Sequence, residues 1–293
     1  MEELRPLLFS LAYRMLGSVS DAEDVVQEAF ARYERTTGVE SPKAWLTSVV
    51  TNLAIDQLRS ARARRETYVG EWLPEPLVDG DDPAALAEQS DTLSMAFLLL
   101  LERLTPVERA VFLLHDVFGY RYDEIAEVVG RSEANCRQIG VRARSHVEAE
   151  KPRFEASRRE RDELAARFFA AVQEGDVDGL VGMLAADVVV VGDGGGKAPQ
   201  WATPIVGAER VARLLAGTGR QIADYGGSLE RREVNGQPGA VLRAPNGSVA
   251  VVWTIEIADG FVQALRSVIN PDKLRHLGPV ADVRALMRSH RRP

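Results

Sequence analysis

The chain has 293 residues, a formal net charge of −7 and a hydrophobic fraction of 45%. This length allows two or three domains with packed cores, and the acidic balance argues against a protein that coats nucleic acid without selectivity, while leaving room for a locally basic face. The single cysteine, Cys136, excludes an internal disulfide and fits a cytosolic setting.

Residues 2–66 are expected to be helical. LRPLLFSLAYRMLG carries apolar residues at helical spacing, ends at Gly17 and lacks the pattern of a signal peptide. An acidic helix follows in DAEDVVQEAFARYER, with Ser20 or Asp21 as its predicted N-cap. The next helix is predicted to begin at Pro42 with Ser41 as its N-cap, and it ends in an arginine-rich stretch.

A linker is expected at residues 69–95, because EWLPEPLVDGDDP contains three prolines and shows no periodicity. Its apolar residues Trp72, Leu73 and Leu77 are unusual for a flexible tether, which would be polar or rich in glycine and serine. The composition therefore favours a segment that lies in a groove on its own protein.

Residues 96–150 are expected to form a helix-turn-helix. Ala126 is small where the two helices cross, Gly130 makes the turn, and Cys136 and Ile139 point inward, so Cys136 is interpreted as a core residue. The outward face of the second helix is suited to base edges in the major groove and to phosphates, or else is simply a solvated face. Its side chains are Arg137, Gln138, Val141, Arg142 and Arg144.

After a second linker at 151–161, residues 162–282 are expected to form an α+β domain, followed by a tail at 283–293. Helices come first, and strand-like runs follow in VVVVGD, GAVLRAP, GSVAVVWTIEIAD and GFVQALRSVIN. DGGGK stands at the end of the first run. It lacks the glycine spacing and the hydroxyl residue of a phosphate-binding loop, and no helical repeat follows it, so a turn is favoured over a nucleotide site.

Two long motifs stand in order: DAEDVVQEAF with SPKAWLTSVVTNLAIDQLR, and then LTPVERAVFLLHDVFGYRYDEIAEVVGRSEANCRQIGVRAR. They resemble the sigma-two and sigma-four domains of extracytoplasmic-function sigma factors. The third domain resembles the SnoaL-like members of the NTF2-like family, and WLPEP, DGGGK and NPDKL are similar to the marks of a sigma-factor subgroup with such an extension. The resemblance implies a multi-domain fold, with an all-α sigma-two domain (1–68), an all-α sigma-four domain (96–150) and an α+β cone (162–282).

The resemblance also implies binding sites. Core RNA polymerase is expected to bind the acidic helix face formed by Asp21, Glu23, Asp24, Gln27 and Glu28. The melted promoter strand is expected on the next helix, at Asn52, Asp56 and Arg59, while Trp45 either stacks on a base or packs in the core. The upstream promoter element is expected at the outward face of the helix-turn-helix.

Regulation between domains is expected from three motifs: Trp72, Leu73, Pro74, Glu75 and Pro76; Asp193, Gly194, Gly195, Gly196 and Lys197; and Asn270, Pro271, Asp272, Lys273 and Leu274. We predict that the DGGGK loop docks on the linker or on the sigma domains. Glycine allows a close backbone approach, and the charges of Asp193 and Lys197 can form hydrogen bonds across an interface.

The expected partners are core RNA polymerase and promoter DNA, without a membrane, in the cytoplasm, and no cofactor, metal or enzymatic activity is expected. One alternative is a DNA-binding regulator with a ligand-binding domain, which leaves the first sixty residues unexplained. Another is a fused cyclase or isomerase. Its acid–base pair is not evident, since His115, His146, His276 and His290 are assigned outside the body of the third domain, and Asp187 and Asp193 alone are a weak signal. A small ligand in the hollow cone stays open.

Overall fold

The protein is described here from a computed structural model, which places residues 2–65, 68–80, 93–148, 157–201 and 203–289. The chain divides into two compact units. Unit 1 contains residues 1–67 and 82–151, and unit 2 contains residues 68–81 and 152–293. The linker that follows the first helical domain therefore packs with the C-terminal domain, although it precedes the second helical domain in the sequence.

The first half of unit 1 is a bundle of three helices, preceded by a short turn: η1 (Glu2–Leu4), α1 (Arg5–Leu16), α2 (Val19–Glu34) and α3 (Pro42–Arg65). Gly17 ends α1 in the left-handed conformation, with φ of 66°, as the sequence predicts. The predicted N-cap of α2 is wrong. Ser18 caps it by accepting a hydrogen bond from the Asp21 amide, because the helix begins two residues before the acidic run. Pro42 begins α3 as predicted.

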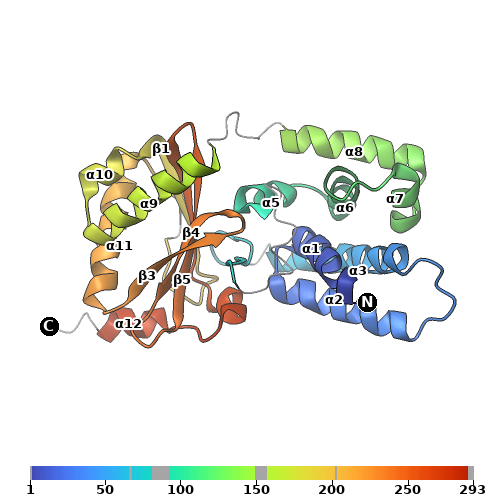
Figure 1. Cartoon of the computed structure of the whole chain (residues 1–293), viewed down its shortest axis with the longest axis horizontal. Coiled ribbons are helices and arrows are strands. Elements are labelled where there is room, and N and C mark those ends of the chain that lie inside the picture. The colour runs from blue at the N-terminus through green and yellow to red at the C-terminus, as the bar shows by residue number, and fades with distance from the viewer. Residues whose placement is uncertain (1, 66–67, 81–92, 149–156, 202, 290–293) are drawn as a thin grey trace. The chain divides into compact units, whose positions relative to one another are not determined.

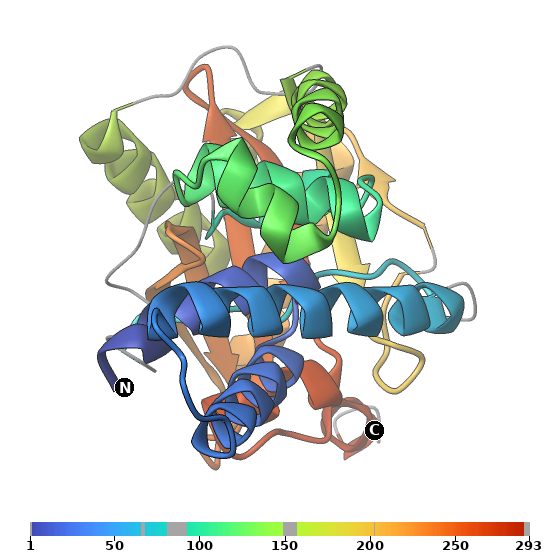
Figure 2. The same cartoon turned by 90° about the vertical axis from the view of Figure 1, so that its right-hand side faces the viewer.

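The second half of unit 1 contains α5 (Met95–Leu101), α6 (Pro106–Phe112), a π-helical turn η3 (Leu113–Val117), α7 (Tyr122–Val129) and α8 (Glu133–Glu148). The turn between α7 and α8 is made by Gly130 at φ of 64°, and Cys136 and Ile139 are buried, which confirms the predicted helix-turn-helix packing. In Figure 2, α3 runs across the view with the green helices of the second half above it and α2 below it, while α1 crosses behind it.

Unit 2 is built on one six-stranded sheet with the strand order β2-β1-β6-β5-β4-β3. Among the pairings between these strands, β1 and β6 pair in parallel and the other four are antiparallel. The strands are β1 (Leu184–Asp193), β2 (Ile205–Val206), β3 (Ser228–Val234), β4 (Gln237–Arg243), β5 (Val249–Ala258) and β6 (Phe261–Val268). Asp259 and Gly260 form the turn between β5 and β6, with φ of 53° and 76°.

Three helices cover one face of this sheet: α9 (Arg158–Glu174), α10 (Val177–Val181) and α11 (Ala208–Asp224) (Figure 1). The core between them contains Phe168, Leu215, Trp253 and Leu265, each almost completely buried. After β6 the chain forms a 3-10 segment, η4 (Pro271–Leu277), and a last helix, α12 (Val283–Ser289). The sheet and helices match the predicted α+β architecture.

Some boundaries differ from the sequence prediction. Strands β2 and β3 were not predicted, because β2 has two residues and SLERREV alternates charges with few apolar side chains. Helix α9 begins at Arg158, inside the range assigned to a linker, because Ser157 and Glu160 form a capping box there. Residues 283–289, assigned to a tail, form α12.

Candidate functional site: the linker against the C-terminal domain

Residues 68–80, which we term the linker segment, lie diagonally across the sheet on the face opposite α9, α10 and α11 (Figure 1). One end contacts Asp193 at the end of β1, and the other contacts Asn235 after β3. Strands β6, β5 and β4 lie between these two strands. Leu73 is 1% exposed, and Pro74, Glu75 and Pro76 are buried. The linker segment therefore packs against its own protein within unit 2.

The carboxylate of Asp193 is the centre of the first contact. It is completely buried, and it accepts hydrogen bonds from Tyr68 Oη at 2.5 Å, the Leu73 amide at 2.9 Å and Lys273 Nζ at 2.6 Å. A buried carboxylate is costly unless charge and hydrogen bonds compensate it. Here one cation and two further donors do so, and two of the three donors belong to the linker segment.

Lys273 joins the same cluster from η4. Its ammonium donates to the Leu73 carbonyl as well as to Asp193, and it lies 4.3 Å from the ring centre of Trp72 and 5.1 Å from that of Tyr68. Cation–π contacts gain strength when the cation is removed from water. We term Asp193 and Lys273 the inner ion pair. Burial and the adjacent Asp193 carboxylate raise the pKa of Tyr68 well above its usual value, so its hydroxyl remains a donor.

Asn270 supports the cluster from the motif near the chain end. Its amide nitrogen donates to Tyr68 Oη at 2.8 Å, and its backbone amide donates to the Asp193 carbonyl. The side chain also caps η4 by accepting from the Asp272 amide. Pro271 is the first residue of η4, and Leu274 is fully buried. NPDKL therefore supplies the cation, a polar contact and an apolar support behind the linker segment.

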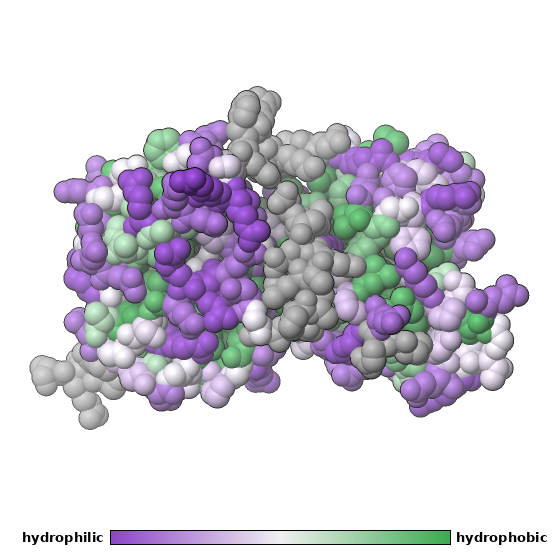
Figure 3. Space-filling model, viewed as in Figure 1, coloured by the Kyte–Doolittle hydropathy of each residue, from purple (hydrophilic) through white to green (hydrophobic). Residues whose placement is uncertain are grey.

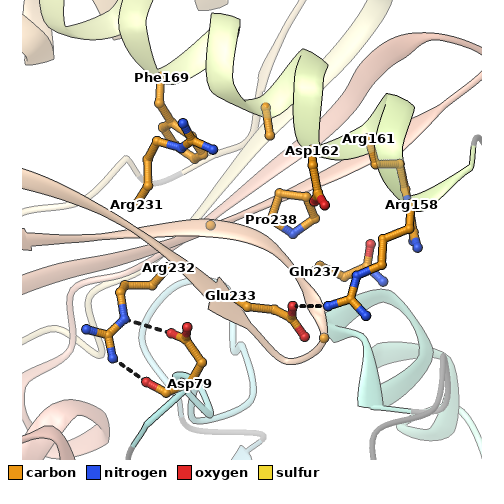
Figure 4. A pocket seen from close by; sticks show the side chains of 13 residues that line it. Asp79, Arg158, Arg161, Asp162, Phe169, Arg231, Arg232, Glu233, Gln237 and Pro238 are labelled. Carbon is orange, nitrogen blue, oxygen red and sulfur yellow. Dashed lines mark hydrogen bonds and ion pairs between the residues drawn. The ribbon is translucent and has the colours of Figure 1, made fainter.

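The second end of the linker segment is held by the β3–β4 turn. The Leu77 amide donates to Asn235 Oδ1 at 3.0 Å, the Asn235 amide donates to the Leu77 carbonyl at 2.8 Å, and the Asp79 amide donates to the Glu233 carbonyl. Arg232 Nε donates to the Asp79 carboxylate at 2.7 Å, and Figure 4 shows this pair. Arg232 also bonds Glu230, and the hydrogen bonds that Glu230 accepts from Arg232 and Arg243 hold its pKa below the usual value.

Several of these contact residues carry no sequence signal. Four of them lie up to 167 positions apart in the sequence and belong to no motif that indicates a shared contact: Tyr68, Asp79, Arg232 and Asn235. Only the fold brings them together. Asn235 has φ of 52°, and the Asn-Gly pair that it begins is a hairpin-turn signal, but nothing in that signal indicates a linker contact. His276, assigned outside the body of the third domain, lies in η4 and bonds the Pro76 carbonyl at 2.8 Å.

The glycines of DGGGK are required by close packing. A Cβ on Gly195 would lie 2.2 Å from Asn270 Nδ2 and 3.0 Å from Tyr68 Oη, and one on Gly194 would lie 2.6 Å from the Ala198 carbonyl. Gly195 and Gly196 also have φ of 55° and 69°. Among the described residues, the side chain of Lys197 forms no hydrogen bond or ion pair with the linker segment. It pairs with Asp272, with both side chains substantially exposed, and we term this the outer ion pair.

In unit 1, the acidic face predicted for α2 is partly exposed. Asp24, Gln27 and Glu28 are exposed, Asp21 is half-buried in the first turn, and Glu23 pairs with Arg5. Glu28 pairs with Arg32 four residues later. Three side chains of this face therefore reach solvent as a partner would require.

The polar face of α3 is engaged inside unit 1. Asn52 Nδ2 donates to the Val128 carbonyl of α7 at 2.9 Å, and the hydroxyls of Thr47 and Tyr120 are 3.0 Å apart. Asp56 and Arg59 pair with each other and are exposed. Trp45 is half-buried and packs edge to face with Tyr33 at 5.7 Å, which is the packing alternative stated for it.

The outward face of α8 is exposed at Arg137, Gln138, Val141 and Arg142. Val141 is 61% exposed, which is unusual for a valine, and mainly hydrophilic side chains cover the outer part of α7 and α8 in Figure 3. Arg137 pairs with Glu133 and lies 5.2 Å from the ring centre of Tyr122. Arg144 differs: it is only partly exposed and pairs with Asp116 at 2.9 Å, so it supports α8 from inside unit 1.

None of the described helices is long and apolar enough to cross a membrane. Among the described residues, no group of three or more histidine, cysteine, aspartate or glutamate side chains is placed to hold a metal ion.

Three family models match the chain. Residues 1–64 match Sigma-70 region 2, residues 94–147 match Sigma-70 region 4, and residues 165–269 match the SnoaL-like domain. The chain is 41% identical over 287 residues to the ECF RNA polymerase sigma factor SigJ of Mycobacterium tuberculosis, covering 93% of this chain and 91% of that protein. It is 32% identical over 275 residues to the probable ECF sigma factor SigI of the same species, covering 92% of each.

The solved structures agree with these matches. The crystal structure of Mycobacterium tuberculosis SigJ aligns with a TM-score of 0.75 and 38% identity, over 94% of this chain and 97% of that one. The similarity therefore covers both helical domains and the C-terminal domain together.

Proposed function

This chain belongs to the extracytoplasmic-function sigma factors, and from this membership we propose that its SnoaL-like domain regulates it in cis by holding the linker segment. As a sigma factor it binds core RNA polymerase and promoter DNA and directs promoter-specific transcription initiation. The regulatory proposal rests on one observation, which is the buried Asp193 carboxylate that accepts hydrogen bonds from Tyr68, Leu73 and Lys273.

The linker segment is a sensible point of control because it joins the two DNA-binding domains. Between Arg65 and Ser94 the free chain can span at most about 100 Å when extended. When residues 68–79 are held on the sheet, only the part between Asp79 and Ser94 is left, which spans at most about 50 Å. Docking thus limits how far the sigma-four domain can move from the C-terminal domain that holds the linker.

Contacts within unit 1 support a restraining direction. Asn52, on the helix face expected to receive the melted strand, is bonded to the Val128 carbonyl of the helix-turn-helix. Arg109 of α6 is 2% exposed, and it donates to the Met15 carbonyl of α1 and pairs with Glu102. A sigma factor that reads two separated promoter elements must part these surfaces. We infer that the docked linker segment favours the closed arrangement.

Run-off transcription with purified core polymerase tests this proposal. Asp193→Ala removes the acceptor of the linker contacts and should raise transcription, while Asp272→Ala, which removes a carboxylate from the outer ion pair, is the matched control and should leave it near the parent level. Equal transcription by both variants and the parent, or a fall with Asp193→Ala, would contradict the restraining role.

The promoter and polymerase sites have separate tests. Asp24→Arg reverses a charge on the exposed face of α2 and should weaken the complex with core polymerase in gel filtration, whereas Glu34→Arg at the end of the same helix should not. Arg142→Ala should cost about 1–3 kcal/mol on the right promoter if this side chain reads a base edge. Equal loss on scrambled DNA would instead indicate a phosphate contact.

The proposed role requires no catalysis by the C-terminal domain. Its cavity is lined by two tryptophans, apolar side chains and a few amides and hydroxyls, and no histidine or carboxylate appears among its described lining residues. General acid–base chemistry most often uses such a group within hydrogen-bond reach of the substrate, and the phenol of Tyr225 is the remaining candidate in this lining. This lining supports a binding domain over a cyclase or isomerase.

A further inference from the structure

The SnoaL-like domain contains a cavity, and the last helix of the chain, α12, forms part of its wall. The cavity has a volume of about 180 Å³ and lies between the C-terminal half of α11 and the strands β4, β5 and β6. Loop residues Pro199–Trp201 and helix α12 complete it. A cavity of this size lined by apolar groups can hold a small aromatic molecule, since engineered cavities of about 150 Å³ bind benzene.

The lining indicates the class of ligand. Trp201, Trp253, Ile222 and Leu242 provide large apolar surfaces. Polar groups are few, namely Gln200, Thr218, Gln221, Tyr225 and Ser267, together with Arg243, whose guanidinium is already paired with Glu230 at 3.1 Å. A charged ligand would find no uncompensated partner among these described residues. The chemistry therefore fits an uncharged molecule of one or two rings with one or two hydrogen-bonding groups.

Helix α12 contacts this cavity with one face and the DGGGK loop with another. Val283, Leu286 and Met287 line the cavity at the three- and four-residue spacing of a helix face. Arg284, on the exposed side, donates to the Gly196 carbonyl at 2.8 Å. A helix of seven residues is marginal by itself, so these contacts decide where it lies.

The DGGGK loop also packs directly against the linker segment. A Cβ on Gly196 would lie 3.3 Å from Val69 Cβ, and one on Gly195 would lie 3.0 Å from Tyr68 Oη. On its other side the loop packs against Gln200, which lines the cavity, since a Cβ on Gly194 would lie 3.0 Å from Gln200 Cβ. The DGGGK loop therefore lies between Gln200 of the cavity wall and the linker residues Tyr68 and Val69.

We propose that the cavity binds a small, uncharged, largely apolar ligand, and that α12 transmits its binding to the linker segment through Arg284 and Gly196. A ligand that displaces Leu286 and Met287 moves α12 and weakens the support of the DGGGK loop. The linker segment then leaves the sheet more often. The effect on transcription rests on the proposed function, but ligand binding and linker release do not.

Binding is tested on the full chain with 2-naphthol, a bicyclic molecule with one hydroxyl, by saturation-transfer NMR and calorimetry. The expected result is binding by the parent and at least tenfold weaker binding by Thr218→Phe, which fills the cavity from α11. Absence of binding by the parent, or equal binding by the filled variant, would overturn the site.

Transmission is tested by hydrogen exchange at the Leu77 and Asp79 amides, which bond the sheet only when the linker segment is docked. We expect 2-naphthol to speed their exchange several-fold in the parent and not in Arg284→Ala, although both bind it equally. The matched control is Arg288→Ala, whose side chain donates to the Arg284 carbonyl within α12, and it should behave as the parent does.

The coupling between α12 and the linker segment can also be tested without a ligand, by a substitution in α12. Leu286→Ala removes an apolar contact of α12 with the cavity and should speed exchange at Leu77 and Asp79 by itself. Unchanged exchange in this variant, or an equal response to 2-naphthol in Arg284→Ala, would overturn the coupling. If linker exchange responds as expected while transcription does not, the regulatory function fails and this inference stands.

Discussion

The inner and outer ion pairs contain the same two residue types from the same two motifs, but their surroundings differ. DGGGK supplies Asp193 and Lys197, and NPDKL supplies Asp272 and Lys273, which pair crosswise. The side chains of the inner pair are 8% exposed or less, whereas those of the outer pair are 56% and 37% exposed. Exposed pairs contribute little to stability, but breaking a buried pair is costly. The inner ion pair is therefore expected to contribute more to the stability of the linker contact than the outer ion pair.

The largest effect is expected from Asp193→Ala. It leaves Lys273 buried without its carboxylate and removes the acceptor for Tyr68 and Leu73, which should cost about 3–5 kcal/mol in the local stability of the linker contact. Hydrogen exchange at the Leu77 and Asp79 amides measures this cost, because both amides bond a region away from the substitution. A loss no larger than that of Asp272→Ala would remove the distinction between the pairs.

A smaller loss is expected from Lys273→Met. Methionine keeps an unbranched chain beside Trp72, and Asp193 still accepts from Tyr68 and Leu73. The substitution removes the charged partner of Asp193, the hydrogen bond to the Leu73 carbonyl and the cation–π contacts. Loss of a hydrogen bond to a charged group is worth about 1.5–3 kcal/mol. The same exchange measurement with Lys197→Met as the control should separate the two lysines. An equal loss of linker stability in both variants would show that burial does not determine how much each lysine contributes.

Tyr68→Phe should remove a contribution that the parent has at neutral pH and loses at alkaline pH. Its pKa is raised above the ordinary value of 10.0, first by burial and then by Asp193, so the folded state retains the proton that the unfolded state releases. The sign follows: this contribution is fully present below about pH 10 and declines as the pH rises further. Linker exchange in the parent should therefore accelerate above pH 10 more steeply than in Tyr68→Phe. Parallel pH profiles would contradict this assignment.

The smallest effect is expected from Lys197→Ala. The outer pair is exposed, so its loss should cost about 0–1 kcal/mol in linker stability at low salt. High salt should abolish even this difference, because exposed charges are screened. A double-variant cycle of Lys197→Ala with Asp272→Ala measures the coupling directly. A coupling as large as that between Asp193 and Lys273 would overturn the comparison.

Local patterns in the sequence were sufficient for most of the fold. The N-cap at Ser41, the stop at Gly17 and the inward Cys136 and Ile139 follow from neighbours within a few residues, so they are readable without a structure. Strand β3 was missed for the same reason, because its charges say little about its pairing with β4. The resemblance to a known family supplied the domain order.

The sequence by itself determined that a proline-stiffened, apolar linker needs a surface, and that a glycine-rich turn after a strand permits close approach. It did not determine the pairing. Asp193 and Lys197 are equivalent candidates in the sequence, and so are Asp272 and Lys273. Only the tertiary structure decides which carboxylate is removed from water, because burial depends on how β1, η4 and the linker segment meet. The free-energy cost of a charge depends on that burial, so the fold determines how much each ion pair contributes to stability, which the motifs alone do not determine.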